Sequence, residues 1–198
     1  MVNVTVSHVD ESLLPDEKPG DYVMRLAEAK VHAAVHNDNP DLVVIGSDTT
    51  VADENEILGK PADKDEAIKM LKQLRGHSHQ VYTAIAAMRV TDGRLLRDLC
   101  VTDVPMRSYS DEEIETYVNS GDPMDKAGAY AIQHPDFHPV VNMQGCFASV
   151  MGLPMCHLER LLRQFDITPK ASIAYGCQKM LNYSCPVTQK ILRGMPTG

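Results

Sequence analysis

The chain has 198 residues, which fits one domain, or two lobes folding as one unit, better than two independent domains. Hydrophobic residues make up 43% and charged residues 23%, a composition typical of globular proteins that excludes a disordered or fibrous chain. The net charge of −8 argues against binding to nucleic acids or anionic membranes, because both need a cationic surface, but a few local lysines and a metal ion can still hold a small phosphate ligand.

The first third of the chain predicts a strand, a loop and a helix. Residues 2–6 are rich in β-branched side chains and predict a short strand, which an acidic, proline-containing loop follows over 8–20. Apolar residues at helical spacing predict an amphipathic helix over 21–36 with Asp21 as its cap. Lys30 would lie at the edge of the apolar stripe of this helix.

An unbroken apolar run at 42–45 predicts a strand that is buried on both faces, as in parallel sheets. The run leads directly to Asp48, which would then lie at the carboxyl end of the strand. A loop ending at 58–61 precedes a capping-box pattern from Asp63 to Glu66, which predicts a helix that Gly76 ends.

The middle of the chain predicts an antiparallel hairpin and a second capped helix. Residues 80–90 and 94–104 are β-rich and flank an Asp-Gly turn at Gly93. Ser110 and Glu113 form a capping-box pattern, so a helix should begin there and end before Gly121.

The remaining third is less regular. Residues 128–133 and 140–150 are irregular or strand-like, and 154–165 predict a final helix with leucines on its apolar side. The tail over 166–198 shows no clear period, and the chain contains no internal repeat.

Hydrolysis of a phosphoanhydride needs acidic ligands for a hard cation, positive groups facing the phosphates and a group that orients water. The residues that offer these groups are Asp10, Glu11, Lys30, Asp48, Lys60 and Gln133. Each also has a simpler interpretation: Asp48 as a carboxylate that caps a loop, Lys30 as a solvated lysine, and the acidic pair as a hydrophilic loop. Lys60 lies between glycine and proline, in a rigid loop.

Other common sites find little support. No P-loop pattern, no G-x-G-x-x-G after a strand and no G-x-S-x-G occur. The pairs His77/His79 and His134/His138 have spacings that zinc can use, but loop histidines are commonly surface groups. The five cysteines are odd in number and form no C-x-x-C, so we expect reduced, structural thiols, with a nucleophilic or zinc-bound cysteine as the alternative.

No run of about 18 apolar residues and no signal-peptide core are found near Met1. We therefore expect a cytoplasmic protein without a membrane partner.

The order of several short motifs resembles the Maf family of nucleotide pyrophosphatases. The motifs are Val9–Glu11, Arg25–Lys30, Ile45–Val51, Leu58–Pro61, His79–Thr83, Thr102–Val104, Tyr117–Val118, Asp125–Gln133 and Val150–Pro154. The resemblance covers roughly residues 8–165, so we expect a Maf-like domain over 1–165 and a C-terminal extension of unknown role over 166–198.

The resemblance implies an α/β fold in which two lobes surround an elongated mixed sheet, similar to the inosine triphosphate pyrophosphatases, with the nucleotide in the cleft between the lobes. It also implies dependence on a divalent metal cation, Mg²⁺ or Mn²⁺, and a possible homodimer. The implied activity is hydrolysis of a nucleoside triphosphate to the monophosphate and pyrophosphate.

The resemblance also assigns the site residues. Glu11 and Asp48 match acidic positions that hold the metal and, with Lys60, form the catalytic set. Lys30, Thr49 and Gln133 match substrate-binding positions. The Asp-Thr pair and Gln133 resemble the subgroup that acts on dTTP and UTP rather than on 7-methyl-GTP.

Two departures from the family bear on function. The usual Ser-x-Ser-Pro-Arg-Arg loop and its helix are not in the chain, so either the coding start lies upstream or the protein naturally lacks this unit. His134 and Ser149 stand where glycine and asparagine are common. The alternatives are therefore a nucleotide-binding or regulatory protein with impaired catalysis, and a structural or partner-binding protein. We expect the residues after Asp166 to cover the surface that the missing unit would leave open.

Overall fold

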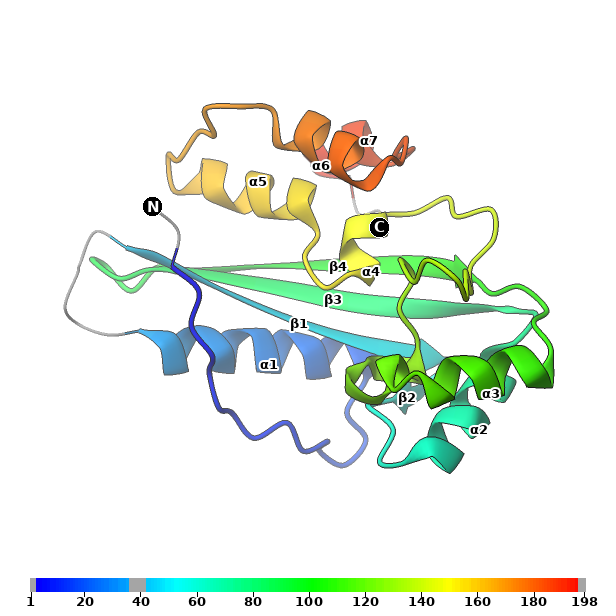
Figure 1. Cartoon of the computed structure of the whole chain (residues 1–198). Coiled ribbons are helices and arrows are strands. Elements are labelled where there is room, and N and C mark those ends of the chain that lie inside the picture. The colour runs from blue at the N-terminus through cyan, green and yellow to red at the C-terminus, as the bar shows by residue number, and fades with distance from the viewer. Residues whose placement is uncertain (1–2, 36–41, 196–198) are drawn as a thin grey trace.

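The computed structural model describes residues 3–35 and 42–195, and a four-stranded sheet lies at its centre (Figure 1). The strands are β1 (Val43–Asp53), β2 (Glu56–Leu58), β3 (Ser78–Arg89) and β4 (Leu95–Pro105). Their order is β2-β1-β3-β4, and every neighbouring pair is antiparallel. The expected α/β fold is confirmed, but the described residues contain none of the parallel pairing that a mixed sheet requires.

β1 differs from the strand that the sequence predicted. Ile45 is 41% exposed, so the apolar run is not buried on both faces. The strand continues through Asp48 because the β-branched residues that follow pair in register with β3, where Asp48 is opposite Ala84. Asp48 therefore lies in the middle of β1 and not at its carboxyl end.

One edge of β1 is largely free of strand pairing. β2 pairs only with residues 51–53 of β1. Within the described ranges no strand pairs with 43–50 on that side. This open edge lies beside Asp48.

The hairpin of β3 and β4 is confirmed. The two strands pair from Ser78 and Pro105 to Met88 and Leu95. Gly93 in the turn has φ of 66°, a conformation in which glycine has no steric penalty. Local turn chemistry therefore fixed this pairing.

The helices are α1 (Pro19–Ala34), α2 (Lys64–Leu74), α3 (Asp111–Asn119), α4 (Phe147–Val150), α5 (Met155–Gln164), α6 (Ile173–Leu181) and α7 (Thr188–Leu192). The predicted helices at α2, α3 and α5 are confirmed, and the capping box of α3 is complete. Asp21 is not the cap of α1, which begins at Pro19 because proline suits the first helical position. In α2, Asp63 caps the helix, but the Glu66 carboxylate accepts from Ala62 N rather than from Asp63.

Helices cover both faces of the sheet. α1 packs on one face, and α4 and α5 pack on the other, with α6 and α7 beyond them (Figure 1). The alternation of β3 side chains explains the two layers, because Ala84 and Ala86 contact the α1 side while Ile85 and Ala87 contact the α5 side. A second apolar cluster around α2 and α3 lies at the far end of the same strands.

Residues 3–10 form no strand, and Val4 and Val6 are 94% and 81% exposed. The strand predicted over 2–6 is therefore wrong where the structure describes it. β-branched composition alone does not make a strand without a partner edge.

The tail contains two helices that the sequence did not reveal. Ala174, Val187 and Ile191 are buried against α4 and α5. The tail therefore lies on the α5 layer and does not cover the free edge of β1, so the expectation was wrong for that strand edge. Within the described residues, no helix combines the length and apolar character needed to cross a membrane.

Candidate active site

Four of the predicted site residues converge beside the free edge of β1. The Lys30 ammonium lies 2.5 Å from Asp48 Oδ1 and 3.0 Å from Glu11 Oε1. Lys60 Nζ lies 3.9 Å from the second oxygen of Glu11. The chain thus brings together α1, β1, the segment before α1 and the loop after β2.

Asp48 and Glu11 differ in burial, and their pKa values shift in different directions. The side chain of Asp48 is 9% exposed, and that of Glu11 is 43% exposed. Burial raises the pKa of Asp48, and the hydrogen bond from Lys30 offsets part of that rise. The hydrogen bond from Lys30 lowers the pKa of Glu11. Their surroundings therefore shift the pKa values of Asp48 and Glu11 in opposite directions.

Lys30 stays charged between them. Burial alone lowers its pKa, but the bonds to Asp48 and Glu11 outweigh that effect and raise it. The simple interpretation of Lys30 as a solvated lysine is therefore wrong, because its side chain is only 22% exposed and is paired with two carboxylates.

Gly46 allows this contact by letting α1 approach β1 closely. A Cβ at Gly46 would lie 2.5 Å from the backbone oxygen of Ala27 and 2.9 Å from Val31 Cγ2. Lys30 lies on α1 between those two residues, and Asp48 follows Gly46 by two positions on the same strand face. Only glycine provides this separation.

A neighbouring pocket holds the other predicted substrate-binding residues. Thr49, Gln133 and Lys60 line a cavity of about 250 Å³. Thr49 and Asp48 are consecutive in a strand, so their side chains point to opposite faces of the sheet. Lys60 links the two groups of residues, because it lines this pocket and its ammonium lies 3.9 Å from Glu11.

Hydrogen bonds fix the pocket wall to the sheet. The hydroxyls of Thr49 and Thr83 lie 2.9 Å apart, and Thr83 donates to the Ser149 carbonyl at 2.8 Å. Ser47 donates to the Gly152 carbonyl at 2.7 Å. The segment from α4 to Gly152 is thereby held against β1 and β3.

Sequence reasoning did not assign two charged residues of this pocket. Asp125 and Lys126 line it, and their side chains are joined by a 2.7 Å ion pair. Both occur in the motif that carried the resemblance, but neither residue's spacing indicated a role. Lys126 adds a third ammonium group near Lys60.

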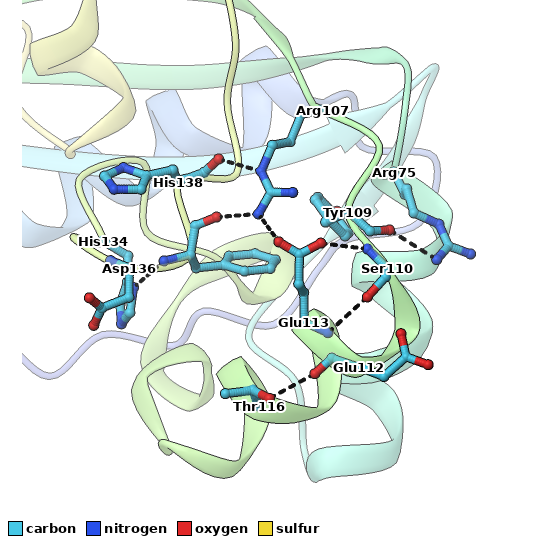
Figure 2. Close-up of polar contacts among 11 residues, drawn as sticks. Arg75, Arg107, Tyr109, Ser110, Glu112, Glu113, Thr116, His134, Asp136 and His138 are labelled. Carbon is cyan, nitrogen blue, oxygen red and sulfur yellow. Dashed lines mark hydrogen bonds and ion pairs between the residues drawn. The ribbon is translucent and has the colours of Figure 1, made fainter.

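The histidine pairs do not form a metal site. His79 Nε2 bonds the Tyr130 hydroxyl at 2.8 Å, while His77 bonds Asp53 at 2.9 Å. His134 Nδ1 accepts from the backbone of Phe137, and the His138 carbonyl accepts from Arg107 (Figure 2). Among the described residues no group of three or more His, Cys, Asp or Glu side chains has metal-binding geometry.

Arg107 holds the loop that contains His134 and His138 against the start of α3. It donates to the carbonyls of Phe137 and His138 and to the Glu113 carboxylate (Figure 2). These bonds tie the 134–138 loop to the start of α3, so they stabilise the lobe away from the carboxylate pair.

All five cysteines are free thiols, as expected. They share one cluster between β4, α4, α5 and the tail, where Cys100, Cys146 and Cys156 are buried and Cys177 and Cys185 are partly buried. Their common burial supports a structural role.

Comparison with known proteins fixes the family. The model of the Maf-like protein family matches residues 1–165. The chain belongs to this family. The match ends where α5 ends, so α6 and α7 lie outside the part that the Maf-like family model covers.

Several proteins similar to this Maf-like chain share a name. The proteins named dTTP/UTP pyrophosphatase from Clostridium botulinum (strain Okra / Type B1) and Bacillus cereus (strain G9842) are 41% and 43% identical to it. The alignments cover 83% of this chain and 86% and 84% of those proteins. A protein of the same name from Pseudoalteromonas translucida (strain TAC 125) is 44% identical over 79% of this chain and 82% of its own length.

Proposed function

We propose that the protein hydrolyses dTTP and UTP to the nucleoside monophosphate and pyrophosphate. The observation that carries the proposal is the convergence of Lys30 with Asp48 and Glu11, at 2.5 and 3.0 Å, from segments far apart in the chain. The shared name of relatives at 41–44% identity supports the choice of substrate.

Asp48 is suited to accept a proton from the attacking water. Burial raises its pKa, which makes it a better base than an exposed aspartate, and the charge of Lys30 favours its ionised form. The water attacks the α-phosphorus, and the bond to the bridging oxygen of the β-phosphate breaks. The nucleoside monophosphate and pyrophosphate result.

Lys30 and Lys60 supply positive charge for the leaving pyrophosphate. The side chain of Lys60 is 61% exposed beside Glu11, so its ammonium is accessible to phosphate oxygens. Lys30 lies deeper, where a positive charge is screened less by water. Together they offset the negative charge that builds up on pyrophosphate.

The donor set fits a divalent cation of the Mg²⁺ or Mn²⁺ type. Lys30 bonds one oxygen of Glu11 and one of Asp48, so each carboxylate keeps a second oxygen. One or two carboxylates together with substrate phosphates are the usual ligands of Mg²⁺. When bound, the cation would neutralise phosphate charge, with Glu11 and Asp48 as its protein ligands.

The test is release of pyrophosphate from dTTP and UTP with Mn²⁺ by the wild-type protein and by Asp48→Asn. Loss of a general base lowers turnover by about 10²–10⁴-fold, so the variant should be nearly inactive. Asp53→Asn is the matched control, because Asp53 lies on the same strand but bonds His77 and Gln73 away from the pocket.

Three outcomes decide the proposal. Turnover that Asp48→Asn abolishes and Asp53→Asn retains supports it. Full turnover by Asp48→Asn removes Asp48 from the mechanism. Tight binding of nucleotide without turnover by the wild-type protein would indicate a nucleotide-binding protein instead.

A further inference from the structure

A second pocket adjoins the first at Gln133. It has a volume of about 490 Å³, and Gln133 lines both pockets. Asn142, Met143 and Phe147 form one side of it, and Met180 at the end of α6 forms another. The volume falls in the range of small-molecule sites.

The two pockets differ in charge. Lys60, Asp125 and Lys126 line the first, next to the carboxylate and lysine cluster. Among the described residues, the lining of the second contains no Asp, Glu, Lys or Arg side chain. A triphosphate therefore belongs in the first pocket, and an uncharged part of the ligand belongs in the second.

The lining of the second pocket matches a pyrimidine base. The amides of Gln133 and Asn142 each offer a donor and an acceptor, and the edge of uracil or thymine presents carbonyl oxygens beside an N–H. Phe147 and the two methionines supply aromatic and polarisable apolar surface for the base plane.

The segment that directly follows α6 is anchored at this pocket. The Tyr183 hydroxyl donates to the carbonyls of Met143 and Gly145, at 3.2 and 2.9 Å, and its ring lies 5.4 Å from that of Phe147. Met180 itself is 90% exposed, so a large apolar side chain stands uncovered at the rim. An uncovered methionine next to an anchored segment is available to a ligand.

We propose that α6, from the extension beyond the family match, completes the base-binding side of the nucleotide site, with Met180 packing on the pyrimidine base. The proposal rests on the proposed function, since it assumes a nucleotide whose phosphates lie near Lys60. It makes Met180 a specificity-determining residue that the shared family region does not supply.

The test compares a ligand that has a base with one that lacks it. Equilibrium binding of the α,β-imido analogue of dTTP, which resists cleavage between the α- and β-phosphates, and of inorganic tripolyphosphate, each with Mg²⁺, is measured by calorimetry with Asp48 intact. Met180→Glu should weaken binding of the dTTP analogue about tenfold, because it removes apolar contact and adds a charge beside the base. Its affinity for tripolyphosphate should change less than about twofold, the change expected when no direct contact is lost.

Tyr175→Glu is the matched control, because Tyr175 is 66% exposed on the same helix and does not line the pocket. It should bind both ligands like the parent. Unchanged binding of the dTTP analogue by Met180→Glu, or equal loss for both ligands, overturns the inference. If the protein with Asp48 intact binds dTTP but does not hydrolyse it, the proposed activity fails while the ratio of the two affinities still decides the role of Met180. If neither ligand binds the protein with Asp48 intact, both proposals fail.

Discussion

The close approach of α1 to β1 predicts that Gly46→Ala damages both stability and activity. The new methyl carbon would lie 2.5 Å from the Ala27 oxygen, whereas ordinary van der Waals contact begins at 3.4 Å. The difference, 3.4 − 2.5, requires α1 and β1 to separate by about 0.9 Å. The obstructing atom belongs to the backbone, so no rotamer change relieves the contact.

The magnitude follows from overpacking and from the position of Lys30. Inserting a methyl group into a filled interior costs about 1–3 kcal/mol of unfolding free energy. A shift of about 1 Å in a catalytic group lowers activity by up to about 10²-fold. Because the lysine chain is flexible and recovers part of the displacement, we expect kcat/KM to fall about tenfold.

The assays are urea unfolding and pyrophosphate release. Gly59→Ala is the control, because a Cβ there meets no atom within 4 Å and the residue also lies beside Lys60. Adding Val31→Ala to Gly46→Ala should not restore stability, since the tightest contact is with the Ala27 oxygen and not with Val31. An unfolding midpoint of Gly46→Ala equal to that of the wild type would refute the reasoning.

Three other perturbations test separate parts of the structure. Lys30→Met should move the acid limb of the kcat/KM profile to higher pH, because Lys30 opposes the rise that burial causes in the pKa of Asp48; an unmoved limb would assign that titration elsewhere. Burial lowers the pKa of His79 from 6.5 to about 4, so His79 binds a proton in the unfolded state before it does so in the folded state. The free energy of unfolding should therefore fall as the pH drops from 6.5 to 4, by at most about 3 kcal/mol. Urea unfolding across this range checks the sign, and His79→Gln should flatten the dependence. A thiol reagent should modify Cys177 and Cys185 first in the native protein and all five thiols after unfolding; fast reaction of a third thiol would contradict the buried cluster.

The elements that the sequence predicted well are those with local signals. The hairpin follows from the Asp-Gly turn at Gly93, and α3 follows from the reciprocal cap of Ser110 and Glu113, because both involve residues a few positions apart. α6 and α7 were missed because they have nine and five residues and bury too few side chains to show a period. Their stability comes from packing on α5, which no local window contains.

In the site too, local sequence signals predicted some features and missed those that depend on tertiary packing. An apolar run marked the start of β1 but not its end, so Asp48 was assigned to a strand terminus although pairing with β3 carries the strand four residues further, to Ala52. Its burial and its contact with Lys30 depend on α1 crossing β1, a tertiary fact. The order of motifs selected four charged residues that the fold brings together, but periodicity alone left each of them with a simple surface role.

The sequence Gly59-Lys60-Pro61 explains why the edge of β1 is unpaired beside Asp48 and Thr49. If β2 continued past Leu58, it would pair with the part of β1 that carries Asp48 and Thr49 and separate their two faces. Pro61 has no N–H to donate to such a ladder, and the Gly59 carbonyl accepts from Gly128 N at 3.0 Å instead. The ladder therefore stops three residues from Asp48, and Lys60 is left to line the Thr49 pocket while its ammonium lies 3.9 Å from Glu11.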